Sequence, residues 1–96
     1  MTHTPTRRSL AAHRLLTASE RVVDLLRLEH VGTVALDAAT DQVEAHCRDL
    51  ELGQVGARFI GTAQLCHATS RRGVWTEFGE VAGELLEAAR HAAGPL

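Results

Sequence analysis

Residues 74–92, VWTEFGEVAGELLEAARHA, form the segment that decides the fold of this chain. At about 100° per residue, its apolar and acidic side chains separate onto two opposite faces of a helix. The apolar face carries Trp75, Phe78, Val81, Ala82, Leu85, Leu86, Ala89 and Ala92, and the other face carries Glu77, Glu80, Glu84 and Glu87. Because such a stripe is unfavourable in water, another part of the chain or another molecule must cover it.

Length and composition indicate one small helical domain. The chain has 96 residues, of which 45% are hydrophobic and only 3% are aromatic. Its core must therefore be built from leucine, valine and alanine, of which leucine and alanine favour helix. Ile60 is the single isoleucine, and this scarcity of β-branched bulk argues against an all-β fold.

Two further stretches before residue 53 show helical spacing. The first begins at Ser9, a suitable N-cap, and runs to about Leu28, while Leu25 and Leu28 lie off its main stripe and indicate cover on two sides. Gly32 separates it from a second helix, for which Thr33 or Asp37 is the expected cap. The stripe of this second helix consists of Leu36, Ala39, Val43, Cys47 and Leu50.

The segment 55–68 fits both a helix and a strand, because its apolar residues satisfy either spacing. We favour a helix, preceded by a turn at residues 53–56. The predicted fold is all-α, a small antiparallel four-helix bundle, with an α+β alternative that has short strands at 31–36 and 55–65. Residues 1–8 are expected to be a flexible arm, 9–93 a single helical domain and 94–96 a tail.

One unusual set of side chains consists of two His/Cys pairs, His46-Cys47 and Cys66-His67. Two thiolates and two imidazoles form a tetrahedral zinc site when they converge, and two thiols can also form a redox pair. Adjacent residues on a helix diverge by about 100°, however, which works against a shared ion. The competing interpretation is that both cysteines are small core residues.

Charge and motifs exclude several classes of function. The net charge of −2 argues against a nucleic-acid partner, for which Arg7, Arg8, Arg71 and Arg72 would be the phosphate contacts. No nucleophile–base motif or phosphate-binding glycine loop is present, so we expect no enzyme. The N-terminal Arg7-Arg8 pair resembles an export signal, but the charges that follow it argue against one, and a cytoplasmic protein without a membrane segment is expected.

The function that these patterns favour is a non-enzymatic protein–protein interaction module. Its expected contact is the stripe of helix 74–92, through which we expect a homo-oligomer to form and another protein to bind. The residues expected to bind the partner are Trp75, Phe78, Val81, Ala82, Leu85 and Ala89. The alternatives are a metal- or redox-responsive regulator that uses Cys47 and Cys66 with His46 or His67, without any other cofactor, and a DNA-binding regulator.

Overall fold

The computed structural model describes residues 7–28, 32–69 and 71–93, and these residues fold into four α-helices without a strand. The helices are α1 (Arg7–Leu26), α2 (Thr33–Asp49), α3 (Gly53–Ala68) and α4 (Arg72–Ala93). The predicted all-α bundle is therefore confirmed. The α+β alternative is wrong, because residues 33–36 and 55–65 are helical.

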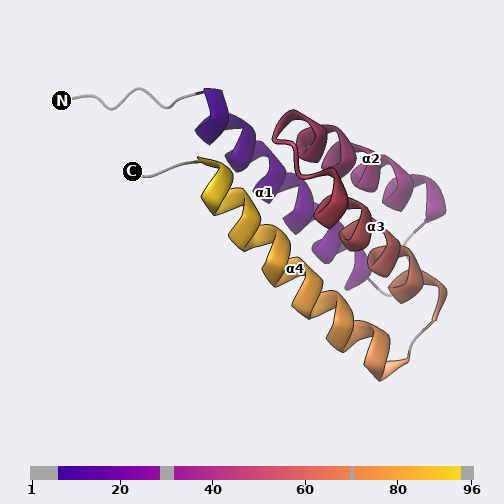
Figure 1. Cartoon of the computed structure of the whole chain (residues 1–96). Helices are drawn as coiled ribbons and strands as arrows, with labels where there is room; N and C mark the ends of the chain where they lie inside the picture. Colours follow the sequence, from indigo (N-terminus) through magenta and orange to yellow (C-terminus); the bar gives the residue numbers. More distant parts are fainter. Residues whose placement is uncertain (1–6, 29–31, 70, 94–96) are drawn as a thin grey trace.

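The four helices form an antiparallel bundle in which consecutive helices lie side by side (Figure 1). Helix α1 packs against both α2 and α4, and α3 packs against both α2 and α4. Helices α1 and α3 also touch across one diagonal, whereas α2 and α4 do not. Helix α1 begins at the end of the bundle where α4 ends, so the first and last helices of the chain are antiparallel neighbours.

The core runs along the bundle axis and receives side chains from all four helices. Its largest fully buried member is Phe59 of α3, whose ring centroid lies 5.2 Å from that of Phe78 of α4. Trp75 meets the same Phe78 ring edge-on at 6.2 Å. All three aromatic residues of the chain thus form one cluster between α3 and α4, and the rest of the core is small and aliphatic. The other buried hydrophobic residues are Ala12, Leu15, Val22, Leu26, Leu36, Ala39, Val43, Cys47, Leu50, Ala63, Cys66, Val81, Leu85 and Ala89.

The helix boundaries differ from the expected ones in two places. Helix α1 begins at Arg7, so Ser9 lies inside the helix and is not its N-cap. Arginine has a high helix propensity, and the nearest helix-breaking residue in the sequence is Pro5. The helix can therefore begin at Arg7, two residues before the predicted cap at Ser9. Helix α2 begins after Gly32 without a side-chain cap, so neither Thr33 nor Asp37 has the expected role. Of the expected arm at residues 1–8, residues 7 and 8 belong to α1 and residues 1–6 lie outside the described residues, as does the expected tail at 94–96.

The connection between α2 and α3 is made by residues 50–52, whereas the sequence predicted a turn at 53–56. The amide of Leu52 donates to the carbonyl of Cys47 at 2.7 Å, and the amide of Glu51 donates to the carbonyl of Arg48 at 3.2 Å. These two bonds define a Schellman cap, which normally has glycine at the position held by Glu51. Glu51 has a φ of 60° and is the one non-glycine residue with positive φ in the described chain. The predicted turn is wrong because this cap ends α2 without using a glycine.

Replacing Glu51 with glycine is expected to raise the free energy of unfolding by about 0.5–1 kcal/mol, because glycine adopts positive φ without a steric penalty. Urea unfolding followed by circular dichroism measures the change. Glu51→Ala, which keeps a Cβ in the left-handed conformation, is the control and should give no such gain. Equal stabilities of the glycine and alanine variants would contradict a strained cap.

Candidate functional site

The apolar stripe of α4, which was expected to bind a partner, packs into the core of the bundle. Phe78, Val81, Leu85 and Ala89 are all at most 4% exposed and belong to the core of the bundle. Trp75 and Ala82 are half-buried and pack against the same core. The four buried side chains cannot contact a second molecule in this fold, so the expectation that they do is corrected. The reason is that α1 and α3 pack against these four side chains.

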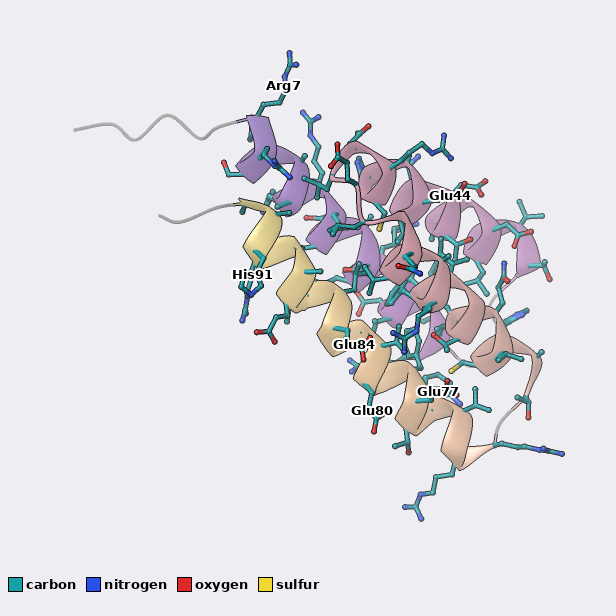
Figure 2. All side chains as sticks on the ribbon, in the orientation of Figure 1. Arg7, Glu44, Glu77, Glu80, Glu84 and His91 are labelled. Carbon is teal, nitrogen blue, oxygen red and sulfur yellow. The ribbon has the colours of Figure 1, made fainter. Side chains whose placement is uncertain are left out.

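The opposite face of α4 remains exposed and acidic. Glu77, Glu80 and Glu84 lie along the helix in Figure 2, and Glu84 forms an ion pair of 2.7 Å with Arg58 of α3. Both side chains of this pair are about half exposed, so it contributes at most a few tenths of a kcal/mol. A similar pair, Arg48 with Glu44 on α2, has the i,i+4 spacing that stabilises an isolated helix weakly. These charges make a solvated surface around the core.

The two cysteines lie apart and contact different helices. Cys47 is buried at the end of α2, where it faces Gly56 near the start of α3. Cys66 lies ten residues beyond Gly56 on α3, which corresponds to about 15 Å along the helix axis. A disulfide requires Cα atoms within about 7 Å, so the two thiols cannot form one in this fold.

The expected four-residue metal site is not assembled either. His46 turns toward α1, Cys47 turns toward α3, and His67 is exposed on α3. No group of three or more metal-binding side chains occurs among the residues that the structure describes. The helical spacing accounts for this result, because neighbours within each His/Cys pair point in different directions.

Both thiols are made less reactive by their surroundings. Burial raises the pKa of Cys47 from its ordinary value of 9.0 to about 11. Burial also raises the pKa of Cys66, and the negative charge of Glu77 adds to this effect. The Cys66 thiol donates a weak hydrogen bond to the Val74 carbonyl, with 3.8 Å between the two atoms. Since the thiolate is the nucleophile and the metal ligand, both cysteines are in the inert form at neutral pH.

Alkaline pH is expected to destabilise the fold through these thiols. The unfolded thiol of Cys47 loses its proton near pH 9.0 and the folded thiol near pH 11, so the stabilisation is complete below pH 9 and is lost as the pH rises toward 11. The chain has no lysine or tyrosine to titrate in this range. Urea midpoints at several pH values should fall for the wild type and fall less for Cys47→Ala. Parallel curves for the two proteins would contradict the prediction.

The arginines proposed to contact phosphates are divided between two ends of the bundle. Arg7 is the first residue of α1 and lies at the same end of the bundle as His91, near the end of α4 (Figure 2). Arg72 begins α4 at the other end, and Arg71 precedes it. Helix α4 has 22 residues and is therefore about 33 Å long, which separates the two pairs. The fold does not combine these arginines into one basic patch.

A groove of about 960 Å³ lies between α1 and α2. Smaller hollows of about 390 and 310 Å³ lie between α2 and α3 and between α1 and α4. The floor of the α1–α2 groove is apolar and consists largely of short side chains. The residues that line it are His13, Arg14, Thr17, Ala18, Glu20, Arg21, Asp24, Leu25, Leu28, Ala35, Ala38, Ala39, Gln42 and His46.

The two ends of this groove differ in chemistry. Because α1 and α2 are antiparallel, His13 and Arg14 of α1 lie at the same end as His46 of α2. Asp24 lies toward the other end, with Leu28, which is 57% exposed. With the histidines neutral, the two arginines and two carboxylates that line the groove sum to zero charge. The groove therefore has an apolar floor and no net charge, with Arg14 toward one end and Asp24 toward the other.

One sequence feature indicated this groove, namely the position of Leu25 and Leu28 outside the main stripe of the first helix. That position predicted cover on two sides, and the structure has α2 beside Leu25 while Leu28 remains exposed. The contribution of α2 had no such signal. Alanine occurs at any position of a helix, so its presence in the sequence predicts no groove. Only the packing of α2 against α1 places Ala35, Ala38 and Ala39 on the floor of the groove.

Comparisons of the chain with protein-family models, with curated proteins and with solved structures give no match. None of the described helices combines the length and the apolar character that spanning a bilayer requires.

Proposed function

We propose that this chain is a non-enzymatic helical interaction module that binds a second copy of itself through the α1–α2 groove. The observation that supports the proposal is the groove itself, which has an apolar floor, exposed Leu28 at one end and opposite charges toward its two ends. A surface with these properties is complementary to an inverted copy of itself, as a two-fold interface requires. The site thus differs from the stripe of α4, which the bundle uses for its own core.

A non-enzymatic role agrees with the chemistry of the described residues. The side chains with clearly displaced pKa values are the two cysteines, and both are displaced toward the unreactive thiol. An enzyme of the nucleophilic or acid–base type needs the opposite, a group whose pKa is tuned toward its working pH within a cleft. The groove also runs between two helices and has four alanines in its lining, an arrangement that suits a helix better than a small substrate.

The test is the mass of the protein in solution. Sedimentation equilibrium at concentrations up to about 100 µM should show a dimer, since that range detects affinities down to about 5–6 kcal/mol. Ala35→Arg places a long charged side chain on the groove floor and should weaken the dimer at least about tenfold.

Ala57→Arg on α3 is the matched control, because Ala57 is also an exposed helical alanine but lies outside this groove. It should leave the dissociation constant unchanged. A wild-type protein that stays monomeric throughout this range would overturn the proposed function, as would an equal effect of both substitutions.

A further inference from the structure

We draw no further inference here: the strongest candidate, the partly exposed apolar face that Leu16 and Val23 of α1 share with Ala82 and Leu86 of α4 around a hollow of about 310 Å³, carries none because nothing in the structure shows what covers it.

Discussion

Phe59→Ala is expected to lower the free energy of unfolding by about 3–5 kcal/mol, the largest effect of any single truncation in this chain. Phe59 is 0% exposed and is the largest fully buried side chain. Its ring lies 5.2 Å from that of Phe78, which in turn contacts Trp75, so the truncation removes one member of the only aromatic cluster. Because the core residues outside this cluster are mostly small, they cannot fill the cavity.

A domain of this size is stabilised by about 5–14 kcal/mol, so this loss would leave a substantial unfolded fraction at moderate urea. Urea unfolding followed by circular dichroism gives the value, with Phe59→Leu as the matched control. Leucine keeps most of the buried volume and should cost less than half as much as alanine. A cost below about 1 kcal/mol for Phe59→Ala would show that Phe59 is not the centre of the core.

Gly56→Ala is expected to lower the free energy of unfolding by about 1–3 kcal/mol, although alanine is the better helix former. A Cβ atom on Gly56 would lie 2.6 Å from the Sγ atom of Cys47 and 2.9 Å from its Cβ atom. The second contact is the serious one, because the Cβ atom of Cys47 cannot rotate away. Helices α2 and α3 would have to move apart.

Gly61→Ala on the same helix is the control, since nothing lies within 4 Å of the added atom. It should stabilise the protein by about 0.5–1 kcal/mol through helix propensity alone. The double variant Cys47→Ala/Gly56→Ala removes the sulfur but keeps the contact between Cβ atoms, so it should recover part of the loss. Equal effects of the substitutions at Gly56 and Gly61, measured by thermal or urea unfolding, would contradict a close helix contact at Gly56.

Much of the fold could be predicted from the sequence because it depends on local periodicity. The spacing of Val81, Leu85 and Ala89 predicted both a helix and its buried face, and the structure has all three residues in the core. The segment 55–68 was ambiguous, because glycine at positions 56 and 61 is unfavourable in helices and strands alike. The close approach of α2 explains why a glycine occupies position 56 of this helix. That approach depends on the packing of two helices and not on the sequence of one segment.

The candidate site was harder to predict than the fold. The stripe of α4 indicated a surface that needs cover, but the sequence does not state whether the cover comes from the same chain. The pairs His46-Cys47 and Cys66-His67 suggested a metal site through their composition, whereas Gly56 and the length of α3 place the two cysteines far apart. The charges on α1 gave no signal by themselves, because Arg14 and Asp24 resemble any solvated helix face.

The sequence by itself determined that this chain is helical and which side of each helix is buried, because backbone propensity and the 3.6-residue period act within single segments. Only the tertiary structure decided that α1 and α3 cover the stripe of α4, and that the exposed side of α1 joins three alanines of α2 in a groove. Which surfaces are covered and which remain free depends on the shapes of residues distant in sequence, and those shapes meet only when the helices pack.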